Sequence, residues 1–153
     1  MGLATHILLT TDFSEASEEA VAKAGELARS TSAKLTVLHV HGRPPGAPEA
    51  FVPAEKVVVS ADLDAEARQA LDKLKGSKLA DVESIALATV EHVSAPLAIC
   101  DYADHHGVDL IVIGTHGRTS VNRLLIGSVA EKVVRHATCP VLVVPHGKNR
   151  SST

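Results

Sequence analysis

Residues 114–128 read GTHGRTSVNRLLIGS, and this stretch decides how the rest of the chain is interpreted. An apolar run, LIVI at residues 110–113, stops at its first glycine, and apolar residues at helical spacing follow its last residue. Glycine has no Cβ, so a glycine-spaced loop can bring backbone N–H groups close to an anion, and the following helix adds partial positive charge. The order of strand, glycine-spaced loop and helix N-terminus favours a phosphate-binding loop, although plain turn glycines would give the same spacing.

The end of this loop carries its own helix signal. Ser128 is a good N-cap residue, and Glu131 three residues later completes a capping-box pattern, although the Ser128 hydroxyl could instead face a phosphate. We expect Val129 and Val133 on one face of the helix that follows. The chain contains no G-x-x-x-x-G-K-[ST], and no G-x-G-x-x-G follows its first strand, so the two commonest nucleotide loops are excluded.

Strand and helix patterns alternate along the whole chain. Residues 41–53, with four prolines and two glycines, are expected to form a loop, either a plain insertion or a flap beside the site. Leu97 is expected to point inward from the third helix. The alternation predicts an α/β fold, a single domain with a doubly wound five-stranded parallel sheet and helices on both faces. A helix is expected after each of the first four strands, and the strands are expected at residues 6–10, 35–40, 84–90, 109–114 and 140–144.

In such a sheet, ligands bind beyond the carboxyl ends of the strands, where the strand order reverses. Asp12 follows the first strand and Gly114 ends the fourth, so both are expected at that edge. A carboxylate there could accept hydrogen bonds from ribose hydroxyls or from a base, or it could serve as a helix N-cap. Two separate features of the sequence thus converge on one candidate site.

Composition narrows the class of protein. The formal net charge is -3, with no Trp, one Tyr and two Phe, so neither a basic surface nor aromatic platforms favour nucleic acid or anionic lipid as partners. No apolar run approaches the roughly 20 residues that span a bilayer, and the N-terminus lacks a basic signal-peptide region. We therefore expect a cytoplasmic protein that binds no nucleic acid and does not insert into membranes. One domain is expected over residues 1–146, followed by a polar tail at residues 147–153.

Cysteine and histidine do not indicate a metal or redox site. Cys100 and Cys139 are too far apart for a metal motif or a C-x-x-C pair, so free thiols are expected. His39 and His41 share a strand face, but no third ligand stands at a suitable spacing. The chain also lacks a readable nucleophile elbow, triad or dedicated catalytic base, so we do not expect an enzyme.

The spacing Gly114-x2-Gly117-x9-Gly127-Ser128 resembles the ATP-binding signature of the universal stress protein family. The segments HILLTTDFSE, AKLTVLHV, RLLIGSVAEKVVRHA and CPVLVVP are also similar to that family, so the resemblance covers residues 4–145. It implies a Rossmann-like sheet in the strand order 3-2-1-4-5, ATP as the ligand with or without Mg²⁺, and a homodimer paired through the last strand, from Pro140 to Val144. That strand is apolar with little flanking charge, as expected of an edge that pairs.

The resemblance also implies a set of nucleotide-binding residues. Asp12 matches the nucleotide-contacting aspartate of the family, and Val40 matches a residue whose main chain contacts adenine. Arg118 is the best positive charge for phosphates, unless it is simply a solvated loop arginine, and His116 is expected to shape the loop. With the backbone around Asp12 and the phosphate and ribose loop, the set is Thr10, Thr11, Asp12, Val40, Gly114, His116, Gly117, Arg118, Gly127, Ser128 and Val129.

These features predict a stress-response protein that binds ATP or another adenine nucleotide. It is expected to act as a nucleotide-dependent switch or sensor, with slow or no hydrolysis. The alternative is a dimeric interaction module of the same fold that works through partner contacts without nucleotide. A nucleotidyl-transfer enzyme of similar fold would need a histidine-rich signature after the first strand, and TTDFSEAS offers none.

Overall fold

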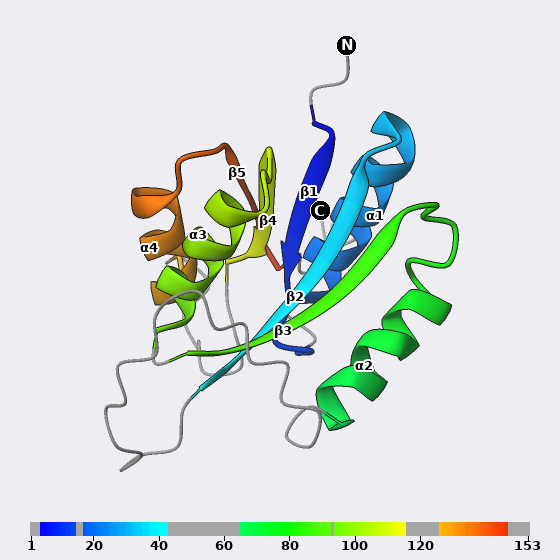
Figure 1. Cartoon of the computed structure of the whole chain (residues 1–153), viewed down its shortest axis with the longest axis horizontal. Coiled ribbons are helices and arrows are strands. Elements are labelled where there is room, and N and C mark those ends of the chain that lie inside the picture. Colours follow the sequence, from blue (N-terminus) through cyan, green and yellow to red (C-terminus); the bar gives the residue numbers. More distant parts are fainter. Residues whose placement is uncertain (1–3, 15–16, 43–64, 93, 116–125, 147–153) are drawn as a thin grey trace, which may run out of the picture.

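The computed structural model describes residues 4–14, 17–42, 65–92, 94–115 and 126–146. In chain order its elements are β1 (His6–Thr10), α1 (Glu18–Thr31), β2 (Lys34–Gly42), α2 (Ala65–Gly76), β3 (Ile85–His92), α3 (Ala95–His105), β4 (Leu110–Gly114), α4 (Ser128–His136) and β5 (Val141–Val144). Helices α1 and α2 lie on one face of the sheet, and α3 and α4 lie on the other (Figure 1). The three layers confirm the predicted α/β architecture.

All four strand pairings are parallel, and the strands stand in the order β3-β2-β1-β4-β5. The doubly wound sheet and the strand order implied by the resemblance are therefore confirmed. β1 lies between β2 and β4, with Leu8 opposite Thr36 on one side and Ile111 on the other. The chain adds β2 and β3 on one side of β1 and then crosses to β4 on the other side, so the direction of winding reverses beside β1.

The central strand shows why both faces of the sheet must be covered. Ile7, Leu8 and Leu9 of β1 are all fully buried. Because side chains alternate along a strand, Ile7 and Leu9 join the core under α1 and α2, whereas Leu8 joins the core under α3 and α4. Burial of each such side chain contributes about 1.5–3 kcal/mol. Three successive apolar positions are thus stable only in a sheet with helices on both faces.

Two strands are longer than the sequence predicts. β2 continues to Gly42 and β3 to His92, because His41 pairs with Glu91 and Gly42 pairs with His92. Each strand supplies the other with backbone hydrogen-bonding groups, so pairing extends beyond the last apolar residues. The predicted loop therefore begins after Gly42 rather than at His41, and the rest of it, residues 43–53, lies outside the described residues.

The prediction that Leu97 points inward is wrong, and Val129 is far more exposed than Val133, with which it is predicted to share a helix face. Leu97 in α3 is 49% exposed and Val129 in α4 is 38% exposed. In α4 the buried residues are instead Ala130 and Val133. An apolar pattern in a short helix fits more than one rotation about its axis, and the neighbouring elements decide which face is buried.

At the amino-terminal edge of the sheet, Asp109 joins the starts of β1 and β4. Its Oδ2 accepts hydrogen bonds from the Thr5 backbone N (2.8 Å), the Thr5 hydroxyl (2.6 Å) and the His6 backbone N (2.9 Å). These bonds, first among them that from the Thr5 hydroxyl, hold the pKa of the Asp109 carboxyl below its ordinary value. The folded chain therefore favours the charged form of this residue.

We predict that Asp109→Asn weakens the acid dependence of stability. The pKa of Asp109 is lower in the folded chain than in the unfolded chain, so its carboxylate stabilises the fold above about pH 4, and this contribution is lost as the pH falls through the folded pKa. Urea unfolding at a series of pH values measures the free energy of unfolding. Between neutral pH and about pH 2.5, this free energy should fall less for the variant than for the wild type. An equal loss in both proteins would contradict this account.

Candidate functional site

The carboxyl edge of the sheet beside β1 brings the two halves of the predicted site together. Leu9 pairs with Val112, so β1 and β4 end side by side, with Asp12 following β1 and Gly114 ending β4. Helix α1 lies on one face of the sheet and α4 on the other (Figure 1). This is the topological switch point at which open parallel sheets bind their ligands.

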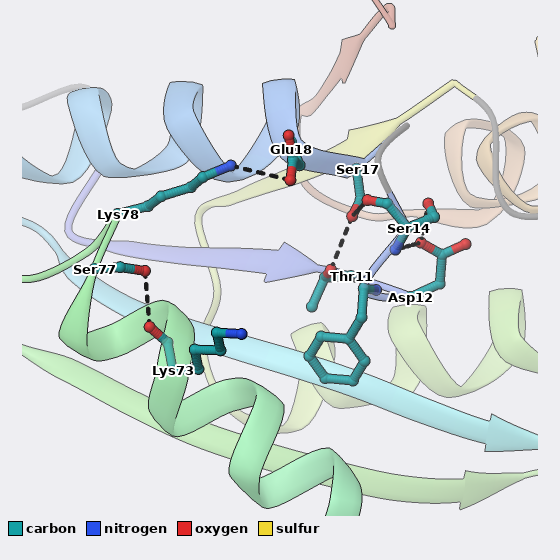
Figure 2. Close-up of polar contacts among 9 residues, drawn as sticks. Thr11, Asp12, Ser14, Ser17, Glu18, Lys73, Ser77 and Lys78 are labelled. Atoms are coloured by element: carbon teal, nitrogen blue, oxygen red, sulfur yellow. Dashed lines mark hydrogen bonds and ion pairs between the residues drawn. The ribbon is translucent and has the colours of Figure 1, made fainter.

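Asp12 shapes the turn that leaves β1. Ser14 donates twice to Asp12 Oδ1, from its backbone N (3.0 Å) and from its hydroxyl (2.5 Å), as Figure 2 shows. Helix α1 begins only at Glu18, with Ser17 at the N-cap and no side-chain capping bond. The interpretation of Asp12 as a helix N-cap is therefore wrong. Its carboxylate is instead held at the end of β1 by an Asx-type turn.

Beneath this turn, a chain of hydroxyl groups connects two buried residues, Thr11 and Ser17. Phe13 N donates to Thr11 Oγ1 (3.0 Å), and Ser17 Oγ donates to the Ser14 carbonyl oxygen (2.8 Å). Because the Ser17 hydroxyl already donates its proton to Ser14, the Thr11 hydroxyl must be the donor in the hydrogen bond between Thr11 Oγ1 and Ser17 Oγ, which are 3.1 Å apart (Figure 2). The Thr11 side chain thus supports the turn that carries Asp12.

Phe13 adopts the left-handed backbone conformation, with φ 63°, although it is not a glycine. Such a conformation costs about 1–3 kcal/mol and persists only where the surroundings hold it. The Phe13 ring lies 4.6 Å from the ring of His39 in β2, between centroids, at a tilt of 39°. His39 Nδ1 lies 2.8 Å from the Thr11 carbonyl oxygen. His39, which the sequence suggested only as a metal ligand, thus contacts both neighbours of Asp12.

The described ends of the glycine-spaced stretch meet through Thr115. The Thr115 N–H donates to the Val144 carbonyl (3.1 Å), and the Thr115 carbonyl accepts from Gly127 N (2.6 Å). The first bond ties the end of β4 to β5, and the second brings the start of α4 back to the end of β4. Residues 116–125 lie outside the described part of the chain, and with them the predicted site residues His116, Gly117 and Arg118.

The N-terminus of α4 differs from the predicted capping box. The N-cap is Gly127, with φ -60° and ψ 155°, and Ser128 is the first helical residue. Glu131 donates its backbone N–H to the Gly127 carbonyl (3.0 Å), and its side chain pairs with Arg135 at 2.9 Å. The capping-box prediction is therefore wrong, because the chain enters the helix one residue earlier. The first amides of a helix have no intrahelical partner and carry partial positive charge, so this end of α4 suits an anion.

Thr115 Oγ1 is buried at this edge and has no hydrogen-bond partner among the residues that the structure describes. A buried unpaired hydroxyl costs about 1–3 kcal/mol. Unsatisfied polar groups and left-handed non-glycine residues are both concentrated at functional sites. The sequence analysis overlooked Thr115 and Phe13, although each directly follows a predicted site residue, Gly114 or Asp12.

All predicted nucleotide-binding residues that the structure describes lie at this edge, but they differ in how far they are buried. Thr10 and Thr11 are buried, and Ser128 and Val129 are exposed. The edge combines a carboxylate with helix-terminal amides, which suits a ligand that carries both hydroxyl donors and an anionic group. The remaining members are half-buried, and they are Asp12, Val40, Gly114 and Gly127.

Within the residues that the structure describes, no group of three or more His, Cys, Asp or Glu side chains could hold a metal ion. Cys100 is buried and Cys139 half-buried, and both are free thiols, as predicted. Burial raises the pKa of both thiols, which makes them poor nucleophiles. None of the helices in the described ranges is long and apolar enough to cross a bilayer.

This chain is similar to known proteins over nearly its whole length. The model of the universal stress protein family matches residues 4–145. Universal stress protein A homolog 1 of Coxiella burnetii is 37% identical over 141 residues, which cover 91% of this chain and 94% of that protein. The structure of the universal stress protein UspA from Lactobacillus plantarum is similar with a TM-score of 0.73 and 33% identity, covering 92% of this chain and 97% of that one. A universal stress protein in complex with cAMP is similar with a TM-score of 0.66 and 26% identity, covering 94% and 98%.

The two threonines at this edge should respond differently to the same substitution. Thr11→Val removes the acceptor of Phe13 N and the donor to Ser17, and should lower the free energy of unfolding by about 1–3 kcal/mol. Thr115→Val removes a buried hydroxyl that has no partner in the described part of the chain, and should leave the free energy of unfolding unchanged or raise it. Urea denaturation of the ligand-free protein measures both effects. An equal loss in the two variants would show that the Thr115 hydroxyl has a partner in solution.

Proposed function

This chain belongs to the universal stress protein family, and from that premise we propose that it binds ATP, or another adenine nucleotide, at the carboxyl edge between β1 and β4. The observation that carries the proposal is the hydrogen bond from Gly127 N to the Thr115 carbonyl. It brings the N-terminus of α4 to the end of β4, beside the strand that leads into Asp12. The related protein in complex with cAMP supports an adenine nucleotide as the ligand class.

In this proposal the phosphates meet the N-terminus of α4. The amides of Ser128 and Val129 supply donors there, and glycine at position 127 allows close approach. Because Gly127 takes the N-cap position, the Ser128 hydroxyl is not needed for capping and can donate to a phosphate oxygen. Gly117 belongs to the phosphate loop that the family resemblance implies, Arg118 supplies positive charge for the phosphates, and His116 shapes the loop.

The nucleoside lies on the β1 and β2 side of the edge in this proposal. The Asp12 carboxylate accepts hydrogen bonds from ribose hydroxyls, and the main chain at Val40 contacts adenine. Thr10 and Thr11 are buried, so they support the turn from below rather than cover the ligand. Mg²⁺, when it accompanies ATP, takes phosphate and carboxylate oxygens as ligands, which are the hard donors that it prefers.

We propose that the bound nucleotide acts as a signal rather than as a substrate. Two titratable side chains at the described part of the edge, Asp12 and His39, hold the turn through hydrogen bonds, and Glu131 in the first turn of α4 pairs with Arg135. A general base must be available to take a proton from water. We therefore expect hydrolysis to be slow or absent and the protein to work as a nucleotide-dependent switch or sensor in the cytoplasm.

We predict that Gly127→Val abolishes ATP binding while leaving the far-UV circular dichroism spectrum unchanged. The backbone at Gly127 is allowed for any L-residue, so valine fills the space in front of α4 without straining the chain. Titration calorimetry with ATP, with and without Mg²⁺, measures the binding. Gly76→Val is the matched control, because an added Cβ there meets nothing within 4 Å, and it should bind as the wild type does. Equal affinity of Gly127→Val and wild type would contradict the phosphate-loop assignment.

We further propose that the protein forms a homodimer through β5, which stands at the end of the strand order. The carbonyl groups of Pro140 and Val144 accept hydrogen bonds from β4, namely from Ile111 N (3.0 Å) and Thr115 N (3.1 Å). In a parallel pair, alternate residues turn their N–H and C=O groups to the same neighbour. The backbone groups of Val141 and Val143 therefore point to the open edge, where a second copy can pair.

We predict that Val143→Pro converts the dimer to monomers, because it removes an outward N–H and leaves the hydrogen bonds to β4 in place. Leu142 is less suitable for this test, since its side chain packs against the core under α1 and a charge there would unfold the chain. Sedimentation equilibrium measures the mass. The matched control is Val143→Ala, which shortens the same side chain but keeps the N–H, and it should remain dimeric. A Val143→Pro protein that dimerises like the wild type would exclude pairing through this edge.

If the dimer forms while no adenine nucleotide binds, the alternative function gains support. The open edge of β5 is the observation that favours this second candidate, an interaction module that works through partner contacts. Denaturing freshly purified protein and identifying any released nucleotide by mass spectrometry separates the two candidates. An adenine nucleotide in equimolar amount supports the switch, whereas an empty protein that also ignores added ATP supports the interaction module.

A further inference from the structure

We propose that His39 is the positioning residue for Asp12. The inference rests on the proposed nucleotide site, because it states what holds the carboxylate of that site in place before the ligand arrives. His39 lies in β2, next to the central strand, where Val40 follows it and Thr89 of β3 stands opposite. The backbone that carries its side chain is therefore fixed by pairing with β3.

His39 contacts the residue on each side of Asp12. Its Nδ1 lies 2.8 Å from the carbonyl oxygen of Thr11, and its ring lies 4.6 Å from the ring of Phe13, between centroids. A carbonyl oxygen can only accept, so Nδ1 carries the proton in this contact. One side chain thus holds the peptide before Asp12 by a hydrogen bond and the residue after Asp12 by ring contact.

The turn needs such support because of Phe13. Its φ of 63° is unfavourable for a residue with a Cβ, so the turn keeps this shape only while its neighbours hold it. Besides the His39 ring, the hydrogen bond from Phe13 N to Thr11 Oγ1 (3.0 Å) resists relaxation. Loss of the His39 contacts leaves Phe13 free to return to negative φ. The peptide between Asp12 and Phe13 then rotates, and the carboxylate moves away from the N-terminus of α4.

The test compares four proteins by ATP titration calorimetry: wild type, His39→Leu, His39→Asn and His6→Leu. Leucine removes the donor and the aromatic face, whereas the asparagine amide restores a donor near the position of Nδ1. His39→Leu should bind ATP about tenfold more weakly, and His39→Asn should recover most of that loss. His6→Leu is the matched control, because both ring nitrogens of His6 are also hydrogen-bonded, to His106 O (3.1 Å) and Thr36 Oγ1 (2.8 Å), but at the opposite edge.

A readout without nucleotide keeps this inference separate from the proposed function. In ¹⁵N NMR spectra of the ligand-free protein, the His39 imidazole should show the Nδ1–H tautomer. The Phe13 and Ser14 amide signals should shift and broaden in His39→Leu, return toward their wild-type positions in His39→Asn, and stay in place in His6→Leu. If the wild type binds no adenine nucleotide, the proposed function fails, and these spectra alone decide whether His39 positions the turn.

Unchanged Phe13 and Ser14 signals in His39→Leu would overturn the inference, as would wild-type ATP affinity in that variant. Equal weakening of ATP binding in His39→Leu and His6→Leu would also overturn it, because the effect would then be general destabilisation. If His39→Leu does not fold, Phe13→Leu replaces it, since this variant removes the ring contact from the other partner at a half-buried position. It should shift the Ser14 amide and weaken ATP binding, and unchanged values of both would contradict the proposal.

Discussion

The parallel pairing of β1 with β2 on one side and with β4 on the other is the constraint on which the rest of the structure depends. Three residues of β1, Ile7, Leu8 and Leu9, are fully buried, so helices must cover both faces of the sheet. Parallel strands require crossovers, and crossovers place every carboxyl end at one edge. The reversal of winding at β1 then brings the segment after β1 next to the segment after β4, although about a hundred residues separate them in the chain.

The two edges of the sheet use polar groups in different ways. At the amino-terminal edge, one oxygen of Asp109 accepts three hydrogen bonds, and both ring nitrogens of His6 are hydrogen-bonded. At the carboxyl edge, Phe13 occupies the left-handed region, and the buried Thr115 hydroxyl has no partner within the described ranges. A left-handed residue occurs at the amino-terminal edge as well, where Ser32 with φ 56° is the C-cap of α1. Among the described residues, the unpaired hydroxyl of Thr115 is therefore the feature that distinguishes the carboxyl edge, and unpaired buried groups of this kind call for a structural or functional explanation.

The proposed nucleotide site and the proposed dimer edge adjoin each other. Val144, the last residue of β5, accepts a hydrogen bond from Thr115, and Thr115 in turn accepts one from Gly127 at the start of α4. On the other flank, His39 ties the turn of Asp12 to β2. The proposed site is thus assembled from segments that four neighbouring strands, β2, β1, β4 and β5, hold in place. Fold and family alone do not assign a function, and it is these contacts rather than the sheet itself that support a nucleotide as the ligand.

The sequence by itself determined the class of fold and the edge of the sheet at which the proposed site lies. The apolar runs and helical repeats gave alternating elements, and glycines after the fourth strand pointed to an anion loop, because these signals depend on local chain chemistry. Only the tertiary structure decided where β2 and β3 end, that α4 turns Val133 inward and Val129 outward, and that Gly127 rather than Ser128 caps α4. It also decided that His39 contacts both neighbours of Asp12. Strand pairing, helix rotation and contacts between distant residues depend on which surfaces meet, and no local pattern in the chain encodes that.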